Sequence, residues 1–199
     1  MSGERGDSGR SPGSPDEEPK AGGADRGGIV VLGLGNSLLS DDGAGIHALC
    51  LLERTGELPP GVRLIDGGTV GPDLLPPVAG CDALLVLDAV DVGGQPGDVA
   101  RLDLEGGAGR PGPRTIHEVG LETLLQDLAL LGEFPRRAVL FGIQPASLSP
   151  GTGLSPPVER GLETLVGAAL GELRRWTQTA GEGSGAGNAG GNARTEDER

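Results

Sequence analysis

The chain has 199 residues and a formal net charge of −13 at pH 7. This acidity argues against binding to nucleic acid or to an anionic membrane surface, because both partners attract a basic face. No apolar run approaches the length of a membrane-spanning helix, and the N-terminus lacks the apolar segment of a signal peptide, so we expect a cytoplasmic protein without a membrane partner.

The two ends of the chain differ in composition from the part between them. Residues 1–28 are rich in Gly, Ser, Pro and acidic residues, and residues 178–199 are a Gly/Ala/Asn run with a charged end. Such segments bury too little apolar surface to offset the entropy that is lost on ordering. We therefore expect two disordered tails around one domain at 29–177. Cys50 and Cys81 lack metal-site spacing and are expected to be small core residues.

The expected domain opens with a strand at 29–32, a continuous apolar run that suits burial on both faces. Gly33 and Gly35 follow at once and permit a tight turn. The loop is similar to a dinucleotide-binding fingerprint but lacks the third glycine of that motif, so the pattern alone is a weak signal.

Two adjacent carboxylates, Asp41 and Asp42, stand where the next expected helix, 41–55, begins. One interpretation is helix capping, because Ser40 and the two acids can accept hydrogen bonds from first-turn N–H groups and negative charge suits that helix end. On this stretch alone, capping is the favoured interpretation. The other is a ligand site, although two acids disfavour a bound pyrophosphate there.

Strands and helices alternate along the remainder of the domain. Further strands are expected at 62–65, 83–87, 98–104 and 137–143, and helices at 71–79, 119–131 and 156–176. The alternating 98–104 segment is expected at a sheet edge, and Pro76-Pro77 is expected to interrupt the short helix. This order predicts an α/β fold with three layers (α/β/α), in which helices flank a twisted, mostly parallel sheet.

Acidic residues recur at the expected strand ends, where ligand sites of such sheets lie. Asp66 follows the second strand and is compatible with a turn before Gly67-Gly68, whereas Asp88 follows the third strand, close to the core, where an unpaired charge is costly. His117 follows a long loop that could bring it over the same edge, and a structural and a functional role weigh equally for it. His47 is expected to be a solvated helix residue. Two carboxylates and one imidazole would suit a divalent-metal site with open positions.

Several stretches, taken together and in this order, resemble the hydrogenase maturation proteases. These endopeptidases remove a C-terminal extension from the large subunit of nickel–iron hydrogenases. The resemblance covers nearly all of 29–175. It is carried by Gly-Leu-Gly-Asn-Ser-Leu-Leu-Ser-Asp-Asp-Gly-Ala-Gly at 33–45, Ile-Asp-Gly-Gly-Thr at 65–69, Leu-Asp-Ala at 87–89, the stretch 117–125 and Phe-Gly-Ile-Gln-Pro at 141–145.

The resemblance assigns roles to three residues. It implies that Asp42, Asp88 and His117 are the catalytic and metal-contacting residues, with Asp42 at a position where some members carry Glu. It also implies that the metal is nickel, that the precursor of the hydrogenase large subunit brings it, and that the protease docks onto it to check that it has been loaded. Nickel held by cysteine thiolates can accept further carboxylate and imidazole ligands. The expected partner is that precursor, met by a monomeric protease.

The chemistry of peptide cleavage is open at this level. The substrate nickel, or a water that it activates, is expected to polarise the scissile carbonyl while a neighbouring carboxylate accepts a proton. Asp41 and Asp66 are both candidates for that carboxylate. No Gly-x-Ser-x-Gly signature of an activated serine is present.

Three other interpretations compete with this one. Peptidyl-tRNA hydrolases also open with a Gly-Leu-Gly-Asn turn, but they need a histidine soon afterwards and a basic surface for tRNA. A non-enzymatic nucleotide-binding or sensor module built on the glycine loop is disfavoured by the missing glycine and by the two acids. A nickel-sensing check on a client other than hydrogenase, on the same fold, is compatible with the sequence, since client choice resides in surface loops.

Overall fold

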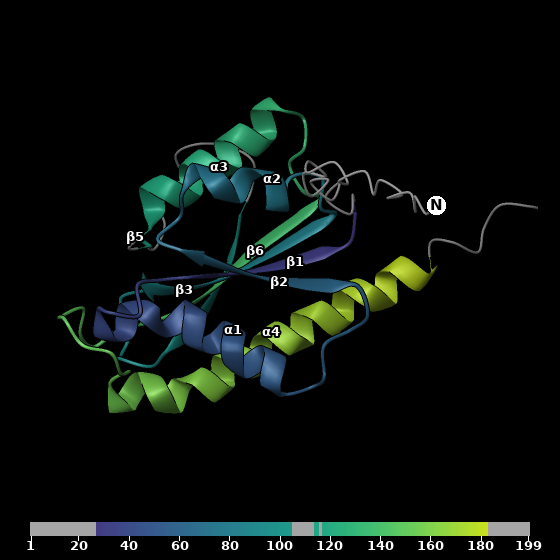
Figure 1. Cartoon of the computed structure of the whole chain (residues 1–199). Helices are drawn as coiled ribbons and strands as arrows, with labels where there is room; N and C mark the ends of the chain where they lie inside the picture. Colours follow the sequence, from purple (N-terminus) through teal and green to yellow (C-terminus); the bar gives the residue numbers. More distant parts are fainter. Residues whose placement is uncertain (1–26, 105–113, 116, 183–199) are drawn as a thin grey trace, which may run out of the picture.

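The computed structural model describes residues 27–104, 114–115 and 117–182, and within them a sheet lies between two layers of helices (Figure 1). Five strands are arranged in the order β2-β1-β3-β6-β4, and β5 pairs with the end of β3. The first four in this order run parallel, and β4 is antiparallel to β6. The strands are β1 (Ile29–Leu34), β2 (Val62–Gly68), β3 (Ala83–Asp91), β4 (Val99–Asp103), β5 (Arg114–Thr115) and β6 (Arg137–Ile143). The predicted three-layer, mostly parallel fold is confirmed.

Two helices cover each face of the sheet (Figure 1). α1 (Ala44–Arg54) and α4 (Pro156–Glu182) pack on one face, and α2 (Leu75–Val78) and α3 (Glu118–Leu130) pack on the other. Side chains alternate across the strands, so each strand feeds both cores. In β1, for example, Val31 joins the core under α1 and α4, whereas Val30 and Leu32 join the core under α3.

The starts of two helices differ from the prediction. A 3-10 turn, Ser40–Gly43, precedes α1, so the two adjacent acids lie before the helix proper. A second 3-10 turn, Pro72–Leu74, leads directly into α2, and Pro76-Pro77 do not interrupt that helix. They fall in its first turn, where the missing N–H would have no intrahelical partner in any case.

The central strand β3 is longer than predicted. It runs to Asp91, so Asp88 lies inside the strand and not at its end. The extension is stabilised by β5, whose Thr115 pairs with Val90, and this pairing had no local signal in the sequence. β6 has the predicted bounds, and β4 is the predicted edge strand.

The two cysteines differ in their surroundings. Cys81 is buried, as predicted, and burial raises the pKa of its thiol to about 11. Cys50 is exposed, so the prediction of a core position is wrong. The buried face of α1 is formed by Ala44, Ala48, Leu49 and Leu52, and a residue two positions from both Ala48 and Leu52 points to the opposite side of the helix.

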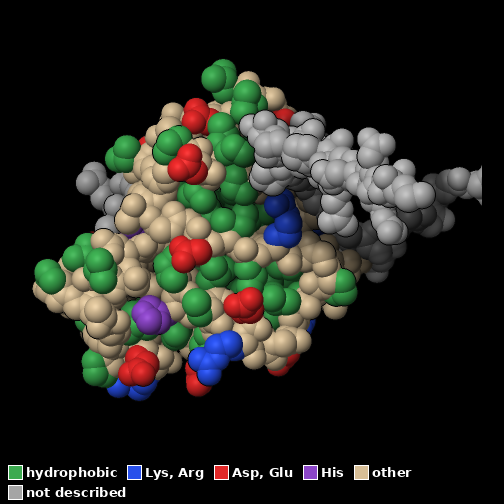
Figure 2. All heavy atoms as spheres, in the orientation of Figure 1, with side chains coloured by type: hydrophobic (Ala, Val, Ile, Leu, Met, Phe, Trp, Pro, Cys, Tyr) green, Lys and Arg blue, Asp and Glu red, His purple; other side chains and the backbone are tan. Residues whose placement is uncertain are grey.

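The predicted tails lie outside the described residues except at 27–28 and 178–182. α4 continues to Glu182, beyond the predicted end at 176, because the residues after Trp176 contain no proline and the first glycine comes at 181. No helix in the described part is long and apolar enough to cross a membrane. On the face shown in Figure 2, acidic side chains are scattered among apolar and neutral ones and form no single patch.

Candidate active site

Three predicted site residues from distant parts of the chain meet at the carboxyl end of the sheet. Asp42 comes from the 3-10 turn after β1, Asp88 from β3, and His117 from the residue that precedes α3. His117 Nδ1 lies 3.1 Å from Asp88 Oδ1, and its Nε2 lies 3.6 Å from Asp42 Oδ2. We call these three residues the acid–histidine cluster. The structure thus brings together residues that are 29 and more positions apart.

The glycine loop after β1 sets the position of Asp42. Gly35 has a φ of +143°, and a Cβ at this position would overlap the carbonyl oxygen of Asp42. The loop can therefore fold back against the 3-10 turn only with glycine here. The backbone N–H of Asn36 then donates to Asp42 Oδ2 at 2.9 Å.

Asp88 occupies the point where β1 stops pairing with β3. β1 pairs with β3 as far as Gly33 and Leu87, whereas β6 continues beside β3 to Ala89. The Asp88 side chain therefore lies where β3 has lost its pairing with β1 and keeps its pairing with β6. Its Oδ1 accepts hydrogen bonds from the Ala89 N–H at 2.8 Å and from His117.

The cluster is buried, yet its carboxylates are incompletely paired. The exposed fractions are 2% for Asp42, 0% for Asp88 and 9% for His117. Asp42 Oδ1 and Asp88 Oδ2 have no hydrogen-bond partner among the described residues. A buried carboxylate oxygen without a donor is costly, so these two atoms mark a place where an incoming group could bind.

Burial and mutual contact shift the pKa values within the cluster. Burial raises the pKa of Asp88, and its hydrogen bond with His117 only partly opposes that rise. For His117, burial lowers the pKa, but the hydrogen bond to Asp88 and the charges of Asp88 and Asp42 outweigh it, so the pKa is raised. Both shifts favour a proton held between the imidazole and the carboxylate.

The donor atoms of the cluster suit a divalent transition metal, since imidazole and carboxylate both bind such ions. In this arrangement, however, each nitrogen of His117 faces one carboxylate, and no three His, Cys, Asp or Glu side chains of the described part surround a point where an ion could sit. The two unpartnered oxygens are therefore the available donors, while the imidazole contacts the other oxygen of each carboxylate.

Comparison with known proteins identifies the family. The family model described as hydrogenase maturation protease matches residues 46–172, which include Asp88 and His117. The hydrogenase 2 maturation protease of Escherichia coli is 39% identical over 148 residues, which span 73% of this chain and 90% of that protein. This chain belongs to the hydrogenase maturation proteases.

Further relatives agree with this assignment. A hydrogenase expression/formation protein, HupD, of Rhodobacter capsulatus is 36% identical over 151 residues, which span 74% of this chain and 72% of that protein. The solved structure of the hydrogenase maturating endopeptidase HybD from E. coli matches with a TM-score of 0.64 and 36% identity, covering 74% of this chain and 93% of that one. The protein is therefore a peptidase. A peptidyl-tRNA hydrolase and a non-enzymatic nucleotide-binding module are set aside.

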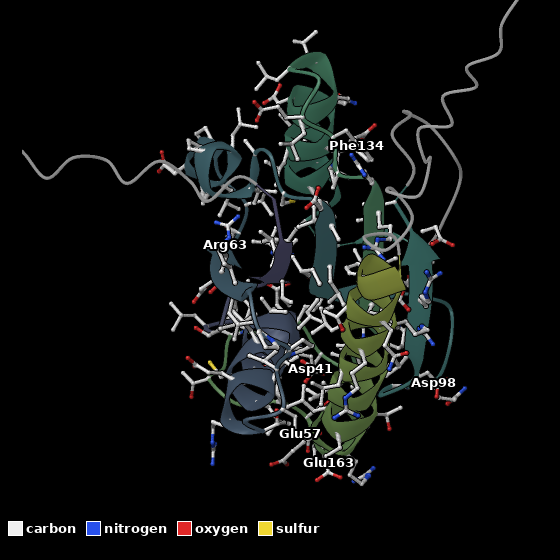
Figure 3. The ribbon with its side chains drawn as sticks, turned by 90° about the vertical axis from the view of Figure 1, so that its right-hand side faces the viewer. Asp41, Glu57, Arg63, Asp98, Phe134 and Glu163 are labelled. Atoms are coloured by element: carbon white, nitrogen blue, oxygen red, sulfur yellow. The ribbon has the colours of Figure 1, made fainter. Side chains whose placement is uncertain are left out.

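In this protease Asp41 is anchored by the loop that follows β6. Its carboxylate accepts four hydrogen bonds, from the N–H groups of Ala146, Ser147 and Ser155 and from the Ser155 hydroxyl, at 2.6 to 3.0 Å. We call Asp41 with these three residues the loop anchor. Asp41 lies between the start of α1 and the residue before α4 (Figure 3).

The hydrogen bonds of the loop anchor bear on two hypotheses about Asp41, that it accepts a proton during catalysis and that it caps a helix. Burial alone would raise the pKa of Asp41, but the hydrogen bonds from Ser155, Ala146 and Ser147 outweigh it and lower the pKa. A carboxylate saturated with donors is a poor proton acceptor. Capping is wrong as well, because neither acid makes a side-chain cap to the 3-10 turn or to α1.

Two further predicted residues lie apart from the cluster. Asp66 is exposed and lies inside β2, which runs to Gly68, so the prediction that the strand ends at Ile65 before a turn is wrong. Its carboxylate accepts a local hydrogen bond from the Gly68 N–H at 3.0 Å. His47 is half-buried on α1, less solvated than predicted. No hydrogen bond joins either residue to the cluster in the part of the chain that the structure describes.

The sequence did not indicate which groups donate hydrogen bonds to Asp41 and Asp42. Asn36 contributes its backbone N–H, and Ser155 contributes both an N–H and a hydroxyl. Backbone donors have no sequence signature. Ser155, however, directly precedes Pro156 at a helix start, and this is where a polar residue with free donors is expected.

Proposed function

We propose that this protease removes the C-terminal extension of the nickel–iron hydrogenase large-subunit precursor after nickel has been inserted. The observation that carries this proposal is the pair of buried, unpartnered oxygens, Asp42 Oδ1 and Asp88 Oδ2, beside the imidazole of His117. A protein that only needed these acids for stability would have supplied donors for them, as it does for Asp41. The names of its relatives supply the hydrogenase context.

In this proposal the nickel belongs to the substrate. Asp42, Asp88 and His117 provide two carboxylates and one imidazole, ligands that nickel accepts. His117 must exchange its contact with at least one carboxylate for the substrate metal, because each of its nitrogens faces a carboxylate in the free protease. A precursor without nickel offers the cluster no cation, so the unpartnered oxygens stay unsatisfied and docking is weak.

Hydrolysis then adds a water oxygen to the carbonyl carbon of the scissile bond, breaks the C–N bond and delivers a proton to the leaving amine. The polarising charge comes from the substrate metal. Asp41 does not fit the role of proton acceptor, since four donors occupy its carboxylate. Asp66 is exposed on β2, and no hydrogen bond among the described residues joins it to the cluster. A carboxylate oxygen of Asp42 or Asp88 that does not bind the metal is the acceptor that the cluster itself offers.

The test is a cleavage assay with nickel-loaded precursor, run beside the same precursor without nickel. His117→Ala tests the cluster, and His47→Ala is the matched control because it removes the only other histidine of the chain. We expect cleavage only with nickel, by wild-type and His47→Ala protease. Cleavage of the nickel-free precursor at the same rate would discard metal recognition, and full activity of His117→Ala would discard the cluster.

A further inference from the structure

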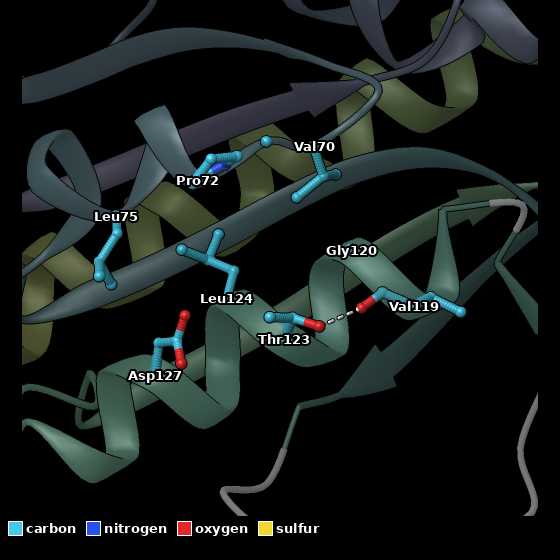
Figure 4. A pocket seen from close by; sticks show the side chains of 9 residues that line it. Val70, Pro72, Leu75, Val119, Gly120, Thr123, Leu124 and Asp127 are labelled. Carbon is cyan, nitrogen blue, oxygen red and sulfur yellow. Dashed lines mark hydrogen bonds between the residues drawn. The ribbon is translucent and has the colours of Figure 1, made fainter.

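A shallow apolar groove of about 180 Å³ runs between α3 and the segment that links β2 to α2 (Figure 4). One wall is formed by Val119 and Leu124 of α3, and the other by Val70 and Leu75. We call it the α3 groove. On the face shown in Figure 2, apolar side chains gather between α2 and α3.

Both walls of the α3 groove are tied to the acid–histidine cluster. Val119 follows His117 by two residues on the same helix start. On the other wall, the end of β2 accepts a hydrogen bond from the N–H of Gly35 at Gly68 O, 2.8 Å away. The residue after Gly35 is Asn36, which holds Asp42. The cluster residues do not line the groove, but both of its walls are joined through the backbone to residues of the cluster.

The groove is shaped by a backbone conformation that valine rarely adopts. Val70 has a φ of +59°, in the left-handed region that disfavours β-branched residues. Its side chain lies against Gly120, where an added Cβ would come within 2.8 Å of Val70 Cβ. Residues held in such conformations cluster at sites that bind ligands. Val119, with 80% of its surface exposed, completes the wall without any packing partner that would bury it in the described part.

The two ends of the groove differ in charge. Val119 stands at the end next to the cluster and Asp127 at the other end (Figure 4). The carboxylate of Asp127 has no hydrogen-bond or ion-pair partner among the described residues. An apolar groove with a carboxylate at the end far from His117 is complementary to a peptide with apolar side chains followed by a basic one.

We propose that the α3 groove binds an apolar segment of the substrate polypeptide that flanks the scissile bond, with Asp127 receiving a cationic side chain farther along that segment. This rests on the proposed function, since it is the precursor that the groove would hold. An endopeptidase must hold the chain beside its reacting groups, and contacts away from the reacting bond provide that positioning. Val119 lies two residues from His117 and Asp127 lines the same groove, so a substrate chain held at the cluster is the occupant that this position and this charge favour.

The test uses the full-length protease and the nickel-loaded precursor in steady-state kinetics. Val119→Ser and Asp127→Asn change the groove, and Leu130→Ser is the matched control because Leu130 is 86% exposed on the same helix but does not line the groove. We expect KM to rise about tenfold for Val119→Ser. A rise of about threefold is expected for Asp127→Asn, with kcat unchanged, because these contacts bind substrate and transition state alike. Leu130→Ser should leave both constants at the wild-type values.

The outcomes separate the groove from the proposed function. If the wild type cleaves the precursor and neither groove variant raises KM, the groove proposal is wrong and the function stands. If the wild type cleaves no precursor, both are wrong. A fall in kcat without a rise in KM would show displacement of His117 and would also overturn the groove.

A photo-crosslinking side chain at position 119, with position 130 as control, provides a second measurement that does not depend on the kinetics. Crosslinking to the precursor from 119 alone supports the groove. Crosslinks only between two protease chains would assign the surface to self-association and overturn the proposal.

Discussion

Asp41 and Asp42 are neighbours with the same side chain and similar burial, yet they lie in opposite electrostatic situations. Asp41 receives four donors from the loop anchor, whereas Asp42 receives one and keeps an oxygen without a partner. The first arrangement stabilises the fold. The second leaves a buried acceptor unpaired and able to bind an incoming group, at a cost in stability. The difference teaches that burial alone does not separate the two acids, whereas the number of hydrogen-bond donors does.

Neutralising each acid in turn is the strongest test of the difference between Asp41 and Asp42. Asp42→Asn should lower the rate of precursor cleavage by about 10²–10⁴-fold. Its free energy of unfolding should change by no more than about 1 kcal/mol, because a charge with an unpartnered oxygen is removed. Cleavage assays and urea denaturation measure the two quantities. Wild-type activity in Asp42→Asn would remove Asp42 from the cluster's chemistry.

Asp41→Asn should show the reverse pattern. An amide NH₂ in place of either oxygen would face donors on the loop anchor, so at least one set of bonds is lost and a donor meets a donor. The free energy of unfolding should fall by about 3 kcal/mol. Amide hydrogen exchange at 146–155 should become faster in the same variant.

Asp66→Asn is the matched control for that experiment, since Asp66 is exposed and makes one local hydrogen bond. It should change the free energy of unfolding by less than about 0.5 kcal/mol. If Asp41→Asn and Asp66→Asn lowered the free energy of unfolding equally, the loop anchor would add no more stability than a single local hydrogen bond.

The two acids also show which features of this protein could be predicted from its sequence and which could not. Strand and helix order predicted the fold, because apolar runs and breakers are local signals. Strand ends pointed to the acids and a long loop pointed to His117. The family resemblance was needed to select Asp42, Asp88 and His117 as one site, since 29 positions separate even Asp88 and His117. The residues alone did not separate Asp41 from Asp42, and only the resemblance did. Apart from the Ser155 hydroxyl, their hydrogen-bond donors are backbone N–H groups brought by folding.

The predicted end of β3 and the predicted burial of Cys50 were wrong for the same reason, contacts with distant parts of the chain. β3 extends past Asp88 because a two-residue strand from a later part of the chain pairs with it. Cys50 was assigned to the core because it is apolar, whereas the helix face that packs is set by Ala44, Ala48 and Leu52. In both cases tertiary pairing decided what local composition left open.

Gly35 tests whether the backbone, and not the side chains alone, places Asp42. Gly35→Ala should lower the free energy of unfolding by about 2–3 kcal/mol, because the new Cβ overlaps the Asp42 carbonyl oxygen at a positive φ. The matched control is Gly56→Ala, where φ is +66° but no atom lies within 4 Å of the added Cβ. That variant should lose only about 1 kcal/mol.

The difference between the two glycine variants isolates the close approach of the loop to the 3-10 turn. The two variants should differ both in denaturation midpoint and in cleavage rate. Gly35→Ala should lose activity and Gly56→Ala should keep it. If Gly56→Ala were as harmful as Gly35→Ala, the positive φ alone would account for the loss, and the loop would not be a device for placing Asp42.

The smallest effect is expected at Glu172, a third kind of buried acid. It lies on α4 and pairs with Arg101 of β4 and with Arg175, two side chains that are 39% and 64% exposed. Burial would raise its pKa, but the hydrogen bonds and charges of the two arginines outweigh this and lower the pKa below its usual 4.5. A lowered pKa means that the ion pairs stabilise the fold above about pH 4.5 and that this contribution is lost as the pH falls through the folded-state pKa.

Glu172→Gln should therefore lower the free energy of unfolding by about 0.5–1 kcal/mol at pH 7, since pairs with exposed arginines are screened by solvent. The gap between variant and wild type should close as the pH falls from about 5 towards 3. Urea denaturation over this pH range measures it. A gap that stays constant with pH would mean that Glu172 acts by packing, whereas a closing gap places it with Asp41 among the acids whose donors are supplied by the fold.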